Sequence, residues 1–335
     1  MFRIGITDFL TDPAPLRTAV LDGLATVECL AARDESELAG RIEGLDALIV
    51  FHDIKLTEAT ISRLDACRLI VRGGVGFDNV DGVAAGRRGI WVCNVPDYGV
   101  DEVADHAMGM ILTVVRKIAY ADRALRNGAT AWNNELVAPV PRLANSVLGV
   151  IGLGRIGTAT ALRAKAFKLR VVACDPYVPP GRDKALGVEL MSLRELLSVS
   201  DIISLHTPLT DETRHLIGPH ALRAMKPGSV LVNTSRGAVV DLPALAEALR
   251  SGHLAGAGID VMPVEPPEAE HPLISLWKRK EGDRPPNLVI TPHIAFYSVM
   301  GITEIHEKAT AEIARVLGGD KPRNPVNVEH FVPRA

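Results

Sequence analysis

Short apolar runs alternate with longer segments of helical periodicity along most of this 335-residue chain. Such alternation is typical of right-handed βαβ units, in which helices cover a parallel sheet. A first series predicts strands at Arg3–Thr7, Thr26–Leu30, Ala47–Phe51, Leu69–Arg72 and Ile90–Asn94, and helices at Leu16–Leu24, Glu35–Ile42, Glu58–Ala66 and Val80–Arg87. This series fills roughly 100 residues, which is enough for one domain.

A second series of the same kind begins at Ser146. It predicts strands at Val147–Ile151, Arg170–Cys174, Ile202–Leu205, Val230–Asn233, Gly256–Asp260 and Leu288–Thr291. Between the two series we expect one long apolar helix, Asp101–Leu125, which either links two domains or packs against a second subunit. The charged segment Ser275–Pro286 is expected to be an exposed loop or a short surface helix, and the last helix is expected at Gly301–Leu317.

The composition excludes several classes of protein. A chain that is 47% hydrophobic and 23% charged is unlike disordered, collagen-like or coiled-coil sequences. Its formal net charge of −3 gives no electrostatic reason to expect nucleic acid or a membrane surface as a partner. The four cysteines are scattered, so we expect reduced, buried thiols. Because no signal peptide and no apolar stretch of membrane-spanning length is visible, we expect a soluble, cytoplasmic protein.

A glycine-rich segment, Gly152–Gly157, follows a predicted strand and opens a predicted helix. In this context a G-x-G-x-x-G pattern predicts a dinucleotide site. Gly152 permits a tight turn, Gly154 lets the backbone approach a pyrophosphate, and Gly157 lets the helix pack close to the strand. The first N–H groups of the helix would then bind phosphate. Since an entire α/β domain precedes this motif, the cofactor domain is expected to be inserted in, or appended to, another domain.

An acidic residue, Asp175, ends the next predicted strand. A carboxylate at this position would accept hydrogen bonds from the adenine ribose hydroxyls and repel a 2′-phosphate, so NAD is predicted in preference to NADP. The other interpretation is that Asp175 only caps the turn before Pro176.

Several motifs in one order along nearly the whole chain resemble the D-isomer-specific 2-hydroxyacid dehydrogenase family. They are Val71–Asp81, the glycine motif, Asn233–Gly237, Gly258–Val261, Val264–Pro266 and Thr291–His293. The resemblance implies an α/β fold of two flavodoxin- or Rossmann-like domains with parallel sheets. An NAD-binding domain (101–298) would be inserted into a discontinuous substrate domain (1–100 and 299–335), and the protein would be a homodimer. Phe51-His52, Cys93–Pro96 and Ala295–Ser298 resemble the branch that includes the C-terminal-binding-protein corepressors.

The resemblance also implies a catalytic set of three residues. His293 would be the acid/base that serves the carbonyl oxygen, since imidazole titrates near neutral pH. Glu265 would hydrogen-bond to His293, orient it and stabilise its protonated form. Arg236 would bind the substrate carboxylate through its planar guanidinium. Each has a plainer interpretation, as a strand-end histidine, a loop carboxylate and a surface arginine.

Binding residues follow from the same resemblance. Asp260 would contact the nicotinamide carboxamide, and His206 would line the cofactor cleft through its backbone. The complete predicted cofactor set is Gly152, Gly154, Arg155, Ile156, Gly157, Asp175, His206, Thr207, Pro208, Thr234, Ser235 and Asp260. The predicted substrate set is Gly74, Val75 and Gly76, whose loop would complete the carboxylate site, with Arg72 and His52. For Arg72 and His52 a purely structural role is the alternative.

The sequence therefore predicts an NAD-dependent oxidoreductase that interconverts a small D-2-hydroxy acid and its 2-keto acid. The alternative is an NAD(H)-sensing, corepressor-like scaffold with little turnover, because such proteins keep the same three residues. Glu265 argues against a formate-type dehydrogenase, and the chain end at Ala335 argues against a long-form phosphoglycerate dehydrogenase. No metal-ligand spacing, Gly-x-Ser-x-Gly elbow or P-loop appears in the sequence, so no metal is expected.

Overall fold

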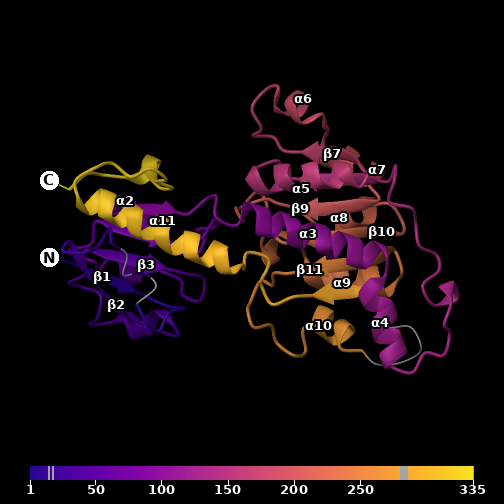
Figure 1. The fold of residues 1–335 in the computed structure, drawn as a ribbon, viewed down its shortest axis with the longest axis horizontal. Helices are drawn as coiled ribbons and strands as arrows, with labels where there is room; N and C mark the ends of the chain where they lie inside the picture. Colours follow the sequence, from indigo (N-terminus) through magenta and orange to yellow (C-terminus); the bar gives the residue numbers. More distant parts are fainter. Residues whose placement is uncertain (14–15, 17–18, 280–285, 335) are drawn as a thin grey trace. The chain divides into compact units, whose positions relative to one another are not determined.

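A computed structural model of the protein describes residues 1–13, 16, 19–279 and 286–334. The chain divides into two compact units, Met1–Gly99 with Tyr297–Ala335, and Val100–Phe296 (Figure 1). Each unit contains one parallel β-sheet, and helices occupy most of the connections between successive strands, so the predicted α/β fold class is confirmed. Residues 280–285 of the charged segment lie outside the described residues.

In its described residues, the first unit contains a five-stranded sheet. The strand order is β2 (Ala25–Cys29), β1 (Phe2–Ile6), β3 (Ala47–Val50), β4 (Leu69–Arg72) and β5 (Trp91–Asn94), all parallel. The helices are η2 (Glu35–Leu38), α1 (Glu58–Ile61), α2 (Gly82–Arg87), α11 (Val299–Leu317) and η5 (Val328–His330). Strands β3 and β4 are buried along their whole length, as expected for inner strands of a parallel sheet.

Asn327 is one of the residues that join the C-terminal segment to this unit. Its side-chain Oδ1 accepts the Val92 N–H at 3.0 Å, and its Nδ2 donates to the carbonyls of Gly82 and Ile90. The ring of Phe331 stacks on Trp91 at a centroid distance of 3.5 Å. Side-chain amides that replace missing backbone partners in this way satisfy groups that are buried at a sheet edge.

Three helices predicted for this unit are shorter or absent. Of the helix predicted at Leu16–Leu24, residues 16 and 19–24 are described, and residues 19–24 form turns. The helix predicted at Glu35–Ile42 is only the 3₁₀ turn η2, because Ala39 adopts an extended conformation (ψ 128°). The helix predicted at Glu58–Ala66 ends at Ile61. The periodicity of apolar residues alone did not predict where these helices end.

Among the described residues, the second unit contains a seven-stranded parallel sheet. Its order is β12 (Leu288–Ile290), β11 (Leu254–Ile259), β10 (Ser229–Asn233), β9 (Ile202–Leu205), β6 (Val147–Ile151), β7 (Arg170–Cys174) and β8 (Glu189–Leu190). The chain first adds β7 and β8 on one side of β6, and then β9 to β12 on the other. The carboxyl ends of β6 and β9 therefore flank the topological switch point, where open α/β sheets bind ligands.

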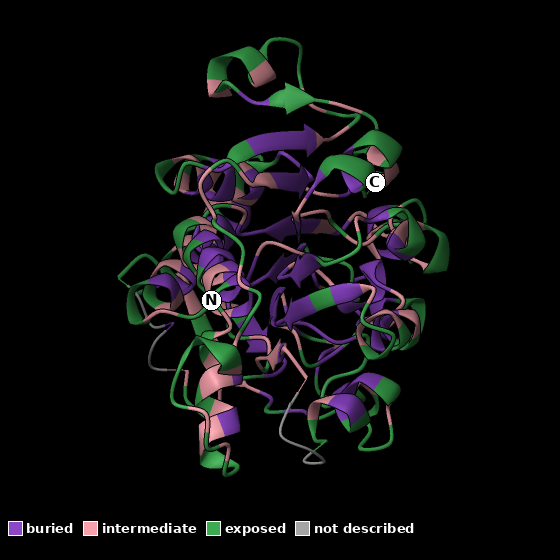
Figure 2. Ribbon diagram, turned by 90° about the vertical axis from the view of Figure 1, so that its right-hand side faces the viewer, coloured by how far each residue is buried: buried purple, intermediate pink, exposed green. Residues whose placement is uncertain are grey.

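Helices cover both faces of this sheet (Figure 1). One face carries α3 (Val100–Val115) and α5 (Arg155–Ala166), and the other carries α7 (Leu193–Val199), α8 (Pro219–Ala224), α9 (Leu242–Arg250) and α10 (Pro272–Trp277). Neighbouring strand residues point to opposite faces, so Val150 packs with the first group and Ile151 with the second. Figure 2 shows the result, with buried strands between helices whose outer surfaces are exposed.

The long helix predicted at Asp101–Leu125 is in fact two helices, α3 and α4 (Ile118–Arg126). Lys117, between them, adopts the left-handed conformation with φ 54°. Its Nζ donates a 2.8 Å hydrogen bond to the carbonyl of Val137. A left-handed residue cannot continue an α-helix, so the prediction of a single helix was wrong. Strand β8 and the short helix α6 (Arg182–Leu186) were not predicted.

Candidate active site

The glycine motif forms the turn between β6 and α5. Gly152 has φ 90°, and a Cβ there would lie 2.6 Å from the carbonyl oxygen of His206. A Cβ at Gly157 would lie 2.0 Å from the carbonyl oxygen of Gly152. A Cβ at Gly154, by contrast, would meet nothing within 4 Å. Gly152 and Gly157 are therefore required for packing within the unit, whereas Gly154 keeps open the space beside the start of α5.

The chemistry around this space fits a dinucleotide. Helix α5 begins at Arg155. The N–H groups of its first residues, Arg155 and Ile156, have no carbonyl partners within the helix. Two buried hydroxyls, Thr207 Oγ1 after β9 and Thr234 Oγ1 after β10, have no hydrogen-bond partner among the described residues. Unsatisfied donors at the carboxyl edge of the sheet are what a pyrophosphate and ribose groups would engage. Pro208 and Ser235 lie beside these two threonines in the chain.

Asp175 follows β7 and connects two turns. Its Oδ2 accepts the Leu153 N–H of the glycine turn at 2.8 Å, and its Oδ1 accepts the Tyr177 N–H at 2.9 Å. The turn-capping interpretation of Asp175 thus has a structural basis. A carboxylate accepts about four hydrogen bonds, so this capping leaves acceptor positions for ribose hydroxyls.

His206 continues β9 beyond its last strand residue. Its N–H donates to the carbonyl of Ile151 at 2.8 Å, and its Nε2 lies 2.9 Å from Ser204 Oγ. Burial lowers the pKa of His206 to about 4. The ring is therefore neutral at pH 7, which suits a residue that contributes its backbone rather than acid–base chemistry.

His293 and Glu265 form the central pair of the site. His293 Nδ1 lies 2.8 Å from Glu265 Oε2, and Glu265 Oε1 accepts the N–H of Met262 at 2.7 Å. The ring of Phe296 approaches the imidazole edge-on, with centroids 6.0 Å apart. Both polar side chains keep some exposure, 23% for His293 and 34% for Glu265. The pair is thus oriented by the protein and still reachable by a small molecule.

Arg236 lies on the turn between β10 and the 3₁₀ helix η4 (Gly237–Val239). Asn233 shapes this turn, because its Nδ2 donates to the Arg236 carbonyl and its Oδ1 accepts from Ser235. A Cβ at Gly237 would lie 2.1 Å from the carbonyl carbon of Met262. The Arg236 turn therefore packs directly against the segment that leads to Glu265, and the structure brings this part of the predicted set together.

Asp260 follows β11 and is 1% exposed. Its Oδ1 accepts the hydroxyl of Thr291 at 2.5 Å and the N–H of Ile294, and its Oδ2 accepts the N–H of Ala295. Its predicted contact with a nicotinamide carboxamide stays a prediction. Sequence reasoning missed His106, whose Nε2 lies 3.1 Å from Thr291 Oγ1. The available signal was a histidine in a helix whose inner face is largely apolar.

The predicted substrate residues lie in the first unit. Arg72, at the end of β4, is 8% exposed and donates from Nη1 to the Gly73 carbonyl at 3.3 Å. Gly74 has φ 149°, and a Cβ there would lie 1.6 Å from Arg72 Nη1. The Val75 carbonyl accepts Asn94 Nδ2, and His52 Nε2 lies 3.3 Å from Asp53 Oδ1. Substrate contacts of Arg72, His52 and the loop Gly74–Gly76 stay predictions.

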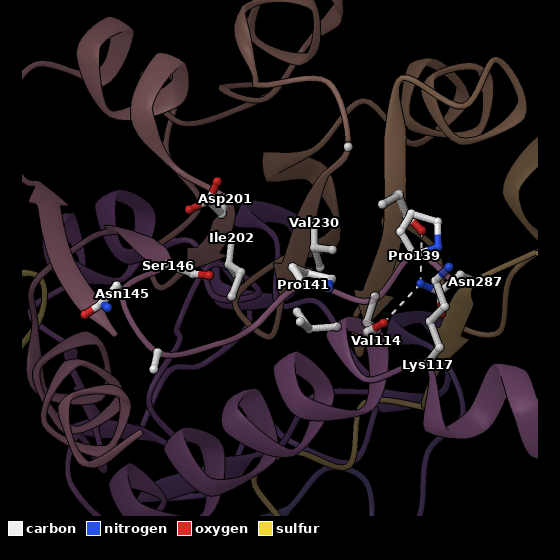
Figure 3. Close-up of a pocket in the computed structure, with 14 residues that line it drawn as sticks. Val114, Lys117, Pro139, Pro141, Asn145, Ser146, Asp201, Ile202, Val230 and Asn287 are labelled. Atoms are coloured by element: carbon white, nitrogen blue, oxygen red, sulfur yellow. Dashed lines mark hydrogen bonds between the residues drawn. The ribbon is translucent and has the colours of Figure 1, made fainter. Parts of the chain in front are cut away.

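A cavity of about 300 Å³ lies elsewhere in the second unit (Figure 3). It is lined by residues at the amino ends of the strands, among them Ser146, Asp201 and Val230, and by Asn287, whose Nδ2 donates to the Val114 carbonyl at 3.1 Å. None of the predicted site residues lines it. Ligands of open α/β sheets bind at the carboxyl ends of the strands, so this cavity is not the reaction site.

Two features are absent from the described residues. None of their helices is both long and apolar enough to cross a membrane. No three of their His, Cys, Asp and Glu side chains gather as metal ligands.

The second unit has a parallel sheet with a glycine turn at its switch point. Arg236, Glu265 and His293 follow neighbouring strands of the same sheet. These features define a dinucleotide-binding class of protein. A family model described as "D-isomer specific 2-hydroxyacid dehydrogenase, NAD binding domain" matches residues 108–295. The chain therefore belongs to the D-isomer specific 2-hydroxyacid dehydrogenase family.

Two curated relatives are both named D-3-phosphoglycerate dehydrogenase. The one from Methanocaldococcus jannaschii is 36% identical over 337 residues, covering 99% of this chain and 60% of the relative. The one from Mycobacterium leprae is 37% identical over 315 residues, covering 93% of this chain and 56% of the relative. The chain thus spans less than two thirds of the length of these relatives. The sequence analysis used the end of the chain at Ala335 as an argument against a long-form phosphoglycerate dehydrogenase. That argument does not apply to the part of these relatives that the chain matches.

Solved structures resemble nearly the whole chain. The D-lactate dehydrogenase from Aquifex aeolicus, complexed with NAD and lactic acid, is 30% identical with a TM-score of 0.85, covering 97% of this chain and 99% of that one. An NADPH-dependent glyoxylate/hydroxypyruvate reductase from Sinorhizobium meliloti, in complex with NADP and malonate, is 28% identical with a TM-score of 0.84. It covers 100% of this chain and 99% of that one.

Proposed function

We propose that this protein is an NAD-dependent oxidoreductase that interconverts a small D-2-hydroxy acid and its 2-keto acid. The observation that carries the proposal is the 2.8 Å hydrogen bond between His293 Nδ1 and Glu265 Oε2, beside the turn that carries Arg236. Family membership and the resemblance to a D-lactate dehydrogenase support it.

The chain's own residues would bind the substrate and move one proton. Glu265 engages Nδ1 of His293, so Nε2 is the ring nitrogen that would give its proton to the carbonyl oxygen during reduction and take it back during oxidation. Glu265 is itself held by the Met262 N–H, which fixes the carboxylate against the ring. When bound, the nicotinamide cofactor supplies or accepts the hydride.

Arg236 would bind the substrate carboxylate. A guanidinium presents its donors in a planar arrangement that matches a carboxylate. The hydrogen bonds of Asn233 to the Ser235 N–H and the Arg236 carbonyl fix the backbone from which this side chain extends. The further substrate contacts of Arg72, His52 and Gly74–Gly76, and the homodimer, rest on the family resemblance alone.

Asp175 supports NAD rather than NADP as the cofactor. A 2′-phosphate carries negative charge, and a carboxylate that is fixed by two backbone N–H groups cannot turn away from it without breaking the Leu153 and Tyr177 bonds. This argument matters because one structural relative is NADPH-dependent.

The test is the loss of NADH absorbance with a panel of 2-keto acids. The panel holds glyoxylate, hydroxypyruvate, pyruvate, and longer aliphatic and phenyl analogues. 3-Phosphohydroxypyruvate is included because two curated relatives are D-3-phosphoglycerate dehydrogenases. Rapid turnover of one member is expected, faster with NADH than with NADPH. Tight NADH binding without turnover of any member would contradict the proposal and favour the scaffold alternative.

A further inference from the structure

His106 belongs to α3, a helix whose inner face is largely apolar. Its Nε2 lies 3.1 Å from Thr291 Oγ1 and 3.6 Å from Asp260 Oδ1. The side chain is 23% exposed, whereas that of Asp260 has no exposed surface. A polar side chain on the inner side of an amphipathic helix requires a partner, and here the partner is the hydroxyl of Thr291.

The hydrogen atoms in this group can be assigned by valence. The Thr291 hydroxyl has one hydrogen, and the Asp260 carboxylate, which can only accept, takes it at 2.5 Å. Thr291 Oγ1 must therefore accept from His106, so Nε2 of His106 carries a hydrogen. The result is a directed chain of hydrogen bonds, from His106 to Thr291 to Asp260.

This chain of hydrogen bonds ends on the turn that carries His293. Both oxygens of Asp260 accept N–H groups of this turn, from Ile294 at 3.0 Å and from Ala295 at 3.0 Å. The N–H of His293 donates to the Asp260 carbonyl at 2.7 Å. His293 has φ 52°, which is unfavourable for a residue with a side chain and persists only where neighbouring bonds hold it. Asp260 supplies these bonds.

We propose that His106 is a positioning residue of the dehydrogenase site, acting through Thr291 and Asp260 on the backbone of His293. His106 orients the Thr291 hydroxyl, the hydroxyl orients the buried carboxylate, and the carboxylate holds the left-handed turn that aims the imidazole. Glu265 fixes the ring of His293, and the His106 chain fixes its backbone. The inference rests on the proposed function for its catalytic consequence, but not for the hydrogen-bond chain itself.

Kinetics of two variants test the catalytic consequence. His106→Leu is expected to lower kcat about 10-fold, the effect of one lost buried hydrogen bond, with KM for NADH changed by less than about threefold. His106→Gln should restore most of kcat, because the amide of glutamine places a donor near the position of Nε2. Equal losses in both variants would overturn the proposal.

A matched control separates positioning from stability. His253 is also partly buried, and its Nε2 makes one hydrogen bond, with the Leu222 carbonyl at 2.9 Å. It precedes β11, at the amino edge of the sheet. His253→Leu and His106→Leu should lower the melting temperature to a similar extent, but only His106→Leu should lower kcat. A loss of kcat in both would mean that a general loss of stability is responsible.

A double-mutant cycle tests the order of the chain. Thr291→Val removes the hydroxyl, so adding His106→Leu to it should lower kcat no further. Additive losses would overturn the relay through Thr291.

A spectroscopic measurement separates failure of this inference from failure of the proposed function. Nitrogen-15 NMR of the histidine rings, with His106→Leu for assignment, should show a hydrogen on Nε2 of His106. That result supports the chain even in a protein without turnover. A neutral His106 with its hydrogen on Nδ1 would overturn it, whatever the activity.

Discussion

His293 and Glu265 are 28 residues apart in the chain, and their side chains meet at 2.8 Å between Nδ1 and Oε2. They meet because β11 and β12 are adjacent parallel strands, so the loops that follow them lie at the same edge of the sheet. The arrangement leaves the two ring nitrogens with different surroundings. In the proposed function, a proton at Nε2 would be exchanged with the substrate while Glu265 keeps the ring fixed.

Replacing the imidazole should abolish most of the turnover. His293→Ala is expected to lower kcat by about 10²–10⁴-fold, the usual contribution of a general acid, while the dissociation constant for NADH changes little. Steady-state kinetics and a fluorescence titration with NADH measure the two effects. Unchanged kcat would remove His293 from the mechanism.

Removing the partner of the imidazole should cost less. Glu265→Gln keeps an oxygen near Nδ1 but loses the charge, so kcat is expected to fall about 10–100-fold. In the double variant with His293→Ala the two losses should not add, because the carboxylate acts only through the ring. Additive losses would show that Glu265 has an independent role in the reaction.

Two glycines of one motif should respond in opposite ways to the same change. Gly157→Ala places a methyl group 2.0 Å from the Gly152 carbonyl and should cost about 1–3 kcal/mol of unfolding free energy. Gly154→Ala meets nothing within 4 Å, so the protein should fold normally. Its methyl group would occupy the space beside the start of α5, however, and NADH should bind at least about 10-fold more weakly.

Urea unfolding and NADH titration of both variants check this contrast. Normal NADH affinity in a stable Gly154→Ala protein would contradict the assignment of the pyrophosphate position.

The strands of the second unit could be predicted because buried parallel strands are short, nearly continuous apolar runs. Val147–Ile151 and Arg170–Cys174 occur at the predicted residues. Strand β8 lacked this signal, since its two residues are exposed and only extend the sheet at its edge. The break at Lys117 depends on a contact with Val137, 20 residues further on, which no local pattern reports.

The candidate site also contains residues that the sequence predicted and residues that it did not. Arg236, Glu265 and His293 could be predicted because each lies within a short motif that resembles the family, and the structure then places the side chains of His293 and Glu265 in contact. The chain from His106 to Asp260 was not found. His106 and Thr291 are 185 residues apart, and the packing of α3 across the face of the sheet brings them together.

The carboxylate of Asp175 should set the cofactor preference. In Asp175→Ala the ratio of kcat/KM with NADH to that with NADPH is expected to fall at least about 10-fold, because a repulsion against the 2′-phosphate is removed. Asp320→Ala, which removes an exposed carboxylate from the first unit, serves as the control and should leave the ratio unchanged. A ratio that stays constant in Asp175→Ala would reduce Asp175 to a turn cap.

His206 should make the folded protein sensitive to mild acid. Its pKa is about 4 in the folded protein, against 6.5 for a solvated histidine such as that of an unfolded chain, and burial is the cause. Between these two values the unfolded chain binds a proton that the folded protein does not, so the free energy of unfolding falls as the pH falls from 6.5 to about 4. The full contribution, at most ~3 kcal/mol, is present above pH 6.5.

His206→Gln removes this titration and keeps a side chain that can hydrogen-bond to Ser204. Urea unfolding of the two proteins at several pH values between about 7 and about 4 isolates the effect, because the other histidines are common to both. The free energy of unfolding should fall more steeply for the native protein than for the variant. Parallel curves would mean that His206 takes up its proton in the folded protein as readily as in the unfolded chain, and that it is not held neutral beside the cofactor turn.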